Sequence, residues 1–287
     1  MEETNMNFHT PPAAHVEHVK LNISDLDHSI EFYTKTLGFS LLNKNDHSAN
    51  LTADGETKIL SLHQPQNSIP KGRTSGLYHF AILLPERSDL AAITLHLAHK
   101  NIRFGSADHL VSEALYLNDP DGNGIEIYID RPAEEWSWKN GRVDMTTDPL
   151  NFEDLLESFN PKQQWDGMPE YTIMGHLHLH VGNLDSVVKF YTEGLGMDIV
   201  YDFPGQAMFM STEKYHHHIA VNIWNGIGAP APGENSVGLN YYVLRYPDEI
   251  SRDAAVSRLE KNGFNVTLED NRIFSADPSG NRVELAF

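Results

Sequence analysis

The chain has 287 residues, enough for two domains that each bury a hydrophobic core. It carries 40 acidic against 21 basic side chains, a formal net charge of −19, which repels nucleic-acid phosphates and anionic membrane surfaces. The sequence contains no cysteine, which excludes disulfides, thiolate nucleophiles and cysteine-based zinc sites. The first residues are polar and acidic, and no apolar run approaches membrane length. We therefore expect a cytoplasmic protein without nucleic-acid or membrane partners.

The two halves of the chain repeat each other at a constant offset of 158 residues. His18 in the first half corresponds to His176 in the second, and Glu126 corresponds to Glu284. Further matched pairs are Leu26 and Leu184, Phe32 and Phe190, Leu37 and Leu195, and Asp119 and Asp277. A fixed offset over a whole half predicts two homologous domains.

Each half begins with an alternating strand that leads into a helix. Apolar and polar residues alternate over residues 18–23, which predicts a half-buried strand. A serine-aspartate pair can cap a helix over residues 26–37, whose apolar residues form one stripe at steps of four, three and four. Gly38 is expected to end this helix. Residues 176–196 repeat the same pattern.

A second, more diverged unit follows in each half. In the first half it comprises a strand at 76–84, a helix near 89–100, and strands at 113–117 and 124–129. A Pro-Asp-Gly turn at 119–123 joins the last two strands. The second half repeats the first of these strands at 238–244, the turn at 277–281 and the last strand at 283–285. The sequence thus predicts an α+β protein of four βαβββ units in two pairs.

Composition shifts along the chain mark the boundaries between these parts. We predict a first domain over residues 14–132 and a second domain over residues 170–287. The segment 133–169 links them and carries a short helical pattern near 152–159. Open sheet edges favour self-association, although no pattern fixes the number of subunits.

Two stretches of this sequence resemble the vicinal oxygen chelate superfamily, which includes glyoxalases, bleomycin-resistance proteins and type I extradiol dioxygenases. One is the strand and helix of residues 18–39, ending in Phe-Tyr-x-x-x-Leu-Gly-Phe, and the other is Tyr116-Leu-Asn-Asp-Pro-Asp-Gly-Asn-Gly-Ile-Glu126. The resemblance covers both halves. It implies that two βαβββ units pair their sheets into an open barrel around a metal site. We expect this pairing to join the two units of each half.

The resemblance also implies a ligand set for the metal. His18, His79 and Glu126 stand where extradiol dioxygenases carry their ligands, and strand alternation turns them toward the expected cavity. Two imidazoles and one carboxylate leave neighbouring coordination positions free, which suits Fe(II) with a bidentate substrate and O₂, and Mn(II) or Zn(II) fit the same ligands. Each histidine alone also fits an ordinary residue at a strand start.

Further residues follow from the same resemblance. His109 and Tyr116 lie in a stretch similar to the dioxygenase segment that supplies a histidine and a tyrosine near the substrate, although this copy is two residues shorter. His217 begins a His-x-Ile-Ala-Val stretch similar to the segment that carries an acid–base histidine. We therefore predict Tyr116 and His109 as catalytic residues.

The second half retains only part of the ligand set. His176 and Glu284 are present, but Tyr241 stands at the position of His79, and a neutral phenol is a poor ligand for iron. The candidates in this half are His176, His217, Tyr241 and Glu284. The alternative for this half is a metal-free pocket that binds an acidic or phenolic ligand through imidazoles.

The function that we expect is metal-dependent extradiol cleavage of a catechol-type aromatic diol by O₂. One alternative is a glyoxalase-like isomerase or lyase. Such sites take a fourth ligand near the position of Ser61, or of Asn222 in the other half, and His63 is close by. The other alternative is a non-catalytic protein of the same fold that binds an aromatic small molecule.

Overall fold

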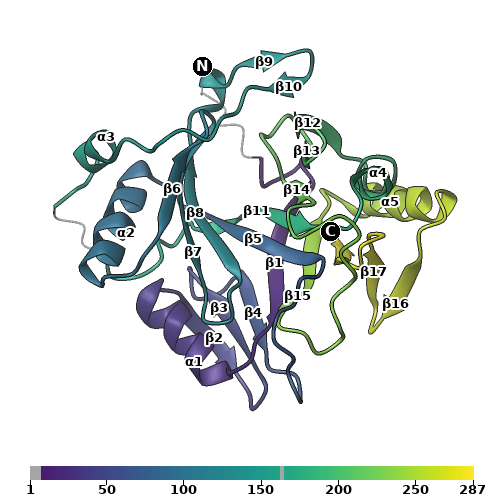
Figure 1. The fold of residues 1–287 in the computed structure, drawn as a ribbon, viewed down its shortest axis with the longest axis horizontal. Coiled ribbons are helices and arrows are strands. Elements are labelled where there is room, and N and C mark those ends of the chain that lie inside the picture. The colour runs from purple at the N-terminus through teal and green to yellow at the C-terminus, as the bar shows by residue number, and fades with distance from the viewer. Residues whose placement is uncertain (1–7, 162–164) are drawn as a thin grey trace.

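The computed structural model describes residues 8–161 and 165–287, so residues 1–7 of the N-terminal segment and 162–164 of the linking segment lie outside the described residues. Its strands form two large sheets of eight strands each and one small hairpin. In Figure 1 the strands β1, β5, β11 and β15 cross the middle of the molecule, and the helices lie toward its flanks. No helix of the described residues is long and apolar enough to cross a membrane. A cytoplasmic location and self-association stay predictions.

The strands divide between the two sheets as follows. Sheet 1 contains β1 (His15–Asn22), β2 (Ser40–Lys44), β3 (Ser48–Thr52), β4 (Leu60–His63), β15 (Gly238–Arg245), β16 (Val266–Glu269), β17 (Arg272–Ala276) and β18 (Arg282–Ala286). Sheet 2 contains β5 (Gly76–Leu83), β6 (Gly105–Asp108), β7 (Ser112–Asn118), β8 (Gly124–Asp130), β11 (Ile173–His180), β12 (Asp198–Phe203), β13 (Ala207–Ser211) and β14 (Ile219–Asn222). The hairpin pairs β9 (Trp138–Lys139) with β10 (Arg142–Val143).

The helices occupy the predicted places. They are α1 (Leu26–Glu31), α2 (Arg87–His99), α3 (Phe152–Glu157), α4 (Leu184–Lys189) and α5 (Glu249–Lys261). In each half the first helix continues as a π-helical turn, over Phe32–Thr36 and over Phe190–Leu195. Gly38 follows the first of these turns at a φ of 89°, a left-handed conformation that glycine adopts without strain.

The four βαβββ units and their pairing into two curved eight-stranded sheets confirm the predicted fold class. The partners within each pair, however, differ from those we expected. β1 lies between β15 and β4, and β5 lies between β11 and β8. The first unit therefore pairs with the fourth, and the second with the third. The predicted pairing of the two units within residues 14–132, and within residues 170–287, is therefore corrected, because each sheet takes one unit from each half. The domain bounds themselves stay a prediction.

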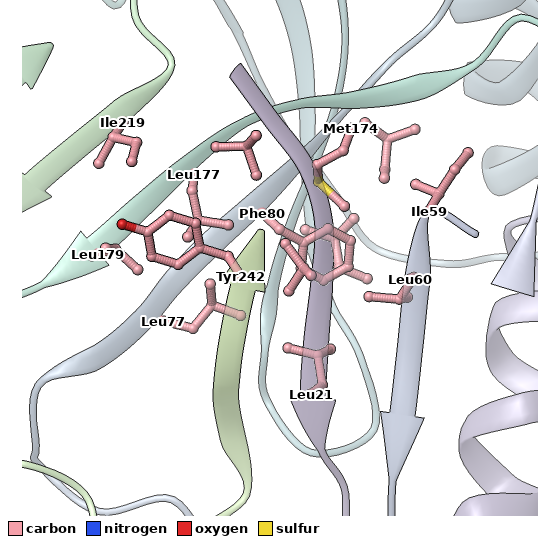
Figure 2. Packing of buried hydrophobic residues seen from close by; sticks show 14 of the residues in the cluster. Leu21, Ile59, Leu60, Leu77, Phe80, Met174, Leu177, Leu179, Ile219 and Tyr242 are labelled. Atoms are coloured by element: carbon pink, nitrogen blue, oxygen red, sulfur yellow. The ribbon is translucent and has the colours of Figure 1, made fainter. Parts of the chain in front are cut away.

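The units of one half remain joined through the core rather than through a strand ladder. Apolar side chains of β1, β5, β11 and β15 form one buried cluster between the two sheets (Figure 2). Leu21 and Tyr242 enter it from sheet 1, and Phe80 and Leu177 enter it from sheet 2. Because successive side chains of a strand point to opposite faces, the residues between these positions face away from the core. The sites of both sheets therefore lie on their outer, concave faces.

Close approach of two strands in sheet 2 requires a glycine. Gly124 pairs with His79 across β8 and β5, and a methyl group there would overlap the carbonyl of Tyr78. A methyl group added to Gly105, at the start of β6, would make only ordinary van der Waals contacts, with Tyr116 Cβ 3.8 Å away.

We expect Gly124→Ala to lower the free energy of unfolding by about 1–3 kcal/mol, because overpacking forces the two strands apart. The matched substitution Gly105→Ala should change it by less than about 0.5 kcal/mol. Urea titrations of both variants, followed by tryptophan fluorescence, measure the difference. Equal midpoints for the two variants would contradict the close approach of β8 and β5.

Buried histidines make the fold sensitive to acid. Burial lowers the pKa of His9 to about 4 and that of His18 to about 2, and it holds the pKa of His218 well below its ordinary value. A folded-state pKa below the unfolded value near 6.5 favours the folded state above pH 6.5, and this contribution is lost as the pH falls toward 4.

Between pH 6.5 and 4.5 we expect each of these histidines to cost about 1.4 kcal/mol of stability per pH unit. The measurement is the free energy of unfolding in urea at half-unit steps of pH. The His9→Gln variant should show a shallower slope, since one titrating ring is removed. A stability that stays flat over this range would rule out the buried neutral state of these rings.

Candidate metal centre

Three side chains from adjacent strands of sheet 2 converge on one point. His79 lies on β5, Glu126 on β8 and His176 on β11, and all three are buried. His79 Nε2 is 3.0 Å and His176 Nε2 is 3.1 Å from the same oxygen, Oε2 of Glu126. One ligand atom from each residue lies within 4.8 Å of the others. These three residues are called the ligand cluster below.

The strand register explains why the ligand cluster forms. Ala81 pairs with His176 on β11 and with Glu126 on β8, so these two side chains flank the same position of β5. His79 precedes Ala81 by two residues and therefore points to the same face of the sheet. Three neighbouring strands thus deliver two imidazoles and one carboxylate to one side of the sheet.

The ligand cluster fits a divalent metal ion. Metal–ligand bonds of about 2.1 Å place neighbouring ligands of an octahedral ion about 3.0 Å apart, close to the two nitrogen–oxygen distances observed. The buried His79 Nε2 has no hydrogen-bond partner among the described residues, although Glu126 lies nearby. An unpaired buried nitrogen aimed at a carboxylate is costly, and a shared cation would remove that cost.

The charge states of the ligand cluster also suit a metal. Burial opposes ionisation of Glu126, but the two imidazoles beside it outweigh burial and hold its pKa well below the usual range. Burial lowers the pKa of His176 to about 4, although Glu126 opposes this shift. At neutral pH the site therefore offers a carboxylate and imidazole lone pairs, the forms that bind metals.

The structure brings together His79 and Glu126 from the predicted ligand set but not His18. His18 lies on β1 of sheet 1, where its Nε2 is 2.8 Å from Ser61 Oγ. Its place beside His79 is taken by His176, the residue that matches it at the offset of 158. The prediction chose the wrong copy because it paired the two units of one half.

Sheet 1 holds the degenerate copy of the same arrangement. Val243 pairs with both His18 and Glu284, just as Ala81 pairs with its two neighbours in sheet 2. The carboxylate of Glu284 accepts hydrogen bonds from the guanidinium of Arg272 at its two oxygens, one of them at 2.8 Å. Tyr241 lies under the same guanidinium, 4.9 Å from ring centroid to Cζ. The guanidinium of Arg272 thus already forms an ion pair with the carboxylate that a metal ion would need as a ligand here.

A cavity of about 600 Å³ opens beside the ligand cluster. Its aromatic lining residues are Tyr78, Tyr116, Tyr201, Phe203, Phe209 and Trp224. Among the described residues that line it, none is a lysine or an arginine, and Glu126 is the one acidic side chain. Such a cavity suits an aromatic ligand without a negative substituent.

Tyr116 and His109 line this cavity and form a hydrogen-bonded pair. His109 Nδ1 is 2.6 Å from the carbonyl of Thr146 and must donate to it, and a ring with its one proton on Nδ1 keeps a lone pair on Nε2. That nitrogen lies 2.6 Å from the hydroxyl of Tyr116 and accepts its proton in a hydrogen bond. Burial and the nearby Glu126 raise the pKa of Tyr116 well above its ordinary value. Its oxygen is therefore a neutral acceptor beside the metal ligands.

Two further histidines line the cavity close to the ligand cluster. The ring centroid of His217 is 4.1 Å from that of His176, and the ring of His178 is 5.1 Å from that of His79. His79 and Glu126, two of the three first-half metal candidates, therefore share one site with His217, the second-half acid–base candidate. Tyr241 and Glu284, the other second-half candidates, lie in sheet 1.

The residues expected for a fourth, glyoxalase-like ligand lie elsewhere. Ser61 and His63 belong to β4 in sheet 1. Asn222 is in sheet 2, but its side-chain oxygen is 2.8 Å from His180 Nδ1 and also accepts from the amide of Trp224. Over the described residues the grouped ligands number three, and no fourth histidine or carboxylate joins them.

Sequence reasoning missed two parts of the site. The linking segment was treated as a connector, yet Met145 and Thr146 from it form one wall of the cavity. Asp130 is hydrogen-bonded to His216, and His216 is hydrogen-bonded to His217. No role was assigned to Asp130 or His216 from the sequence. The run His216-His217-His218 was the available signal for the second part, whereas the linking segment carried none.

Known proteins resemble this chain in sequence and in fold. It is 42% identical over 268 residues to a catechol-2,3-dioxygenase of Bacillus subtilis (strain 168), covering 92% of this chain and 94% of that protein. It is 32% identical over 151 residues to biphenyl-2,3-diol 1,2-dioxygenase 3 of Rhodococcus globerulus, covering 50% and 76%.

Solved structures show the same fold. A putative dioxygenase from Bacillus subtilis subsp. subtilis str. 168 superposes with a TM-score of 0.64 at 14% identity, covering 96% of this chain and 85% of that one. Glyoxalase I from Zea mays superposes with a TM-score of 0.57 at 18% identity, covering 95% and 92%. The model of the Glyoxalase/Bleomycin resistance protein/Dioxygenase superfamily matches residues 15–127 and 173–285, and the chain belongs to this superfamily.

Proposed function

We propose that this protein is an extradiol dioxygenase, which cleaves the ring of a catechol-type diol with O₂ and serves aromatic degradation. The observation that carries the proposal is the ligand cluster of two imidazoles and one carboxylate at an aromatic cavity. The 42% identity to a catechol-2,3-dioxygenase over 92% of the chain supports the same reaction.

His79, Glu126 and His176 would hold the metal ion on one side. We propose Fe(II), while Mn(II) and Zn(II) remain alternatives because the donor set accepts them. When bound, the ion would supply positive charge that favours the ionised diol, and the electrons that reduce O₂ would come from the diol that is cleaved. The chain itself contributes one negative charge to the ligand cluster, from Glu126, and the cavity adds no other acidic group among its described lining residues.

Tyr116 and His109 would orient the diol. The hydroxyl of Tyr116 is held at the cavity wall by its hydrogen bond with His109 Nε2. A substrate hydroxyl can donate to this oxygen and so be held in one orientation relative to the ligand cluster. Fixing a reactant in this way removes part of the entropic barrier of the reaction.

His217 would act as the proton acceptor. It lines the cavity next to His176, and burial holds its pKa well below the ordinary value, so the ring is neutral near pH 7. A neutral imidazole can take the proton of a substrate hydroxyl and return it later to an oxygen of the product. His178 lies across the cavity beside His79 and completes its polar side.

The direct test is to load the purified protein with Fe(II) under anaerobic conditions and then add catechol and air. We expect a yellow ring-cleavage product of the muconic semialdehyde type, which retains both atoms of O₂. Formation is followed by absorbance and by mass spectrometry with labelled O₂. An iron-loaded protein that yields no product would refute the proposed reaction.

The duplicated histidines offer a matched pair of variants. We expect His176→Ala to lose metal binding and ring cleavage, because it removes a ligand. His18→Ala removes the equivalent side chain from sheet 1, and we expect it to retain one metal ion per folded chain and most of the activity. Metal content after dialysis is measured by elemental analysis, with circular dichroism as the check of folding. The reverse pattern would place the metal in sheet 1.

The cavity lining predicts a preference for uncharged substrates. Burying a carboxylate without a cationic partner costs several kcal/mol, so a catechol with an alkyl or aryl substituent should exceed a carboxylated catechol in kcat/KM by at least about 100-fold. Met145→Lys adds a cation to the cavity wall and should lower the ratio of kcat/KM for the uncharged catechol to kcat/KM for the carboxylated one. Equal kcat/KM values for the two substrate classes in the wild-type protein would contradict this prediction.

A further inference from the structure

A series of three hydrogen-bonded side chains ends at the cavity wall. Asp130 lies at the end of β8, and its Oδ1 is 2.8 Å from His216 Nε2. His216 Nδ1 is in turn 2.8 Å from His217 Nδ1, and the ring of His217 lines the cavity. Both histidines are in the loop between β13 and β14.

The chemistry of these groups fixes the direction of each hydrogen bond. A carboxylate only accepts, so Asp130 requires the proton of His216 to be on Nε2. An imidazole ring with its one proton on Nε2 carries a lone pair on Nδ1 and can only accept there. His217 must therefore donate from Nδ1, which leaves its Nε2 as the unprotonated nitrogen. The ring of His217 lines the cavity, and the hydrogen bond within the series uses its Nδ1 and not its Nε2.

We propose that Asp130 and His216 are positioning residues that hold His217 in the Nδ1–H tautomer, with the Nε2 lone pair available to a ligand in the cavity. The opposite tautomer would place an N–H at Nε2, and such a ring could not accept a proton from a substrate hydroxyl. The catalytic consequence rests on the proposed function, whereas the tautomer itself does not.

The surroundings of His216 favour one fixed arrangement. The ring is fully buried, and a buried donor or acceptor without a partner costs about 1–3 kcal/mol, so rotating it would leave two groups unpaired. Asp130 is held from its other oxygen by the hydroxyl of Tyr215 at 2.9 Å. The ring of Trp136 also packs against that of His216, with the ring centroids 5.3 Å apart. The series is thus supported by rigid aromatic neighbours.

The test reads the tautomer directly. Full-length protein labelled with ¹⁵N-histidine, without metal, is studied by two-bond ¹H–¹⁵N correlation NMR at pH 7.5, and the His217 signals are identified by their loss in His217→Gln. We expect the pattern of an Nδ1–H ring. An Nε2–H pattern in the wild-type protein would overturn the proposal, whatever any variant does.

A pair of variants tests the role of His216. His216→Phe keeps the ring shape but removes the acceptor, and His216→Asn can place an amide oxygen near the position of Nδ1. We expect His216→Phe to lose the single tautomer and to lower kcat by about 10- to 100-fold, with metal content and KM nearly unchanged. His216→Asn should restore the Nδ1–H pattern and much of kcat. A wild-type pattern and kcat in His216→Phe would also overturn the proposal.

The two proposals fail in different ways. If the iron-loaded wild-type protein cleaves no catechol but His217 shows the Nδ1–H pattern, the proposed reaction is wrong and the positioning by Asp130 and His216 stands. If the protein cleaves catechol but His217 shows the Nε2–H pattern, the reaction stands and the positioning is wrong.

Discussion

The antiparallel pairing of β5 with β11 is the interaction on which the site depends. It joins the second and third units of the chain and places His176 beside Ala81, across from Glu126. Without this pairing, the ligand cluster would contain one imidazole, that of His79, instead of two. The parallel pairing of β11 with β14 brings His217, in the loop before β14, against His176. Residues that are distributed over both halves of the sequence therefore form one chemical unit.

Burial makes the carboxylate of the site depend on a positively charged partner. The two sheets differ in what that partner is. In sheet 2 the buried carboxylate of Glu126 lies against the imidazoles of His79 and His176, whose lone pairs leave room for an added cation. In sheet 1 the equivalent Glu284 is bound by Arg272, so its charge is already neutralised within the chain. A carboxylate that is removed from water, fully as in Glu126 or largely as in Glu284, is stabilised by a cation. One copy obtains it from a side chain, and the other is left to obtain it from solution.

Much of the fold and part of the site could be predicted from sequence. The repeat, the four units, the helices after the first strands and the turns at Asp119 and Asp277 follow from local patterns, and the structure contains them. His79 and Glu126 lie within one unit of sequence and were correctly grouped. The choice between His18 and His176 could not be made, because homologous strands have the same pattern and either copy can pair with β5. Strand pairing is decided by long-range packing of the core, which no local pattern records.

The division of the site between the halves also explains how the two sheets could diverge. Because each sheet draws one unit from each half, a change on β17 or β15 affects sheet 1 alone. Arg272 and Tyr241 are such changes, and neither touches the ligand cluster. The shared core of Leu21, Phe80 and Leu177 still requires both sheets to fold together. Sheet 1 therefore serves as the packing partner that holds β5 and β11 in place, while on its own concave face the salt bridge between Arg272 and Glu284 stands where sheet 2 has the ligand cluster.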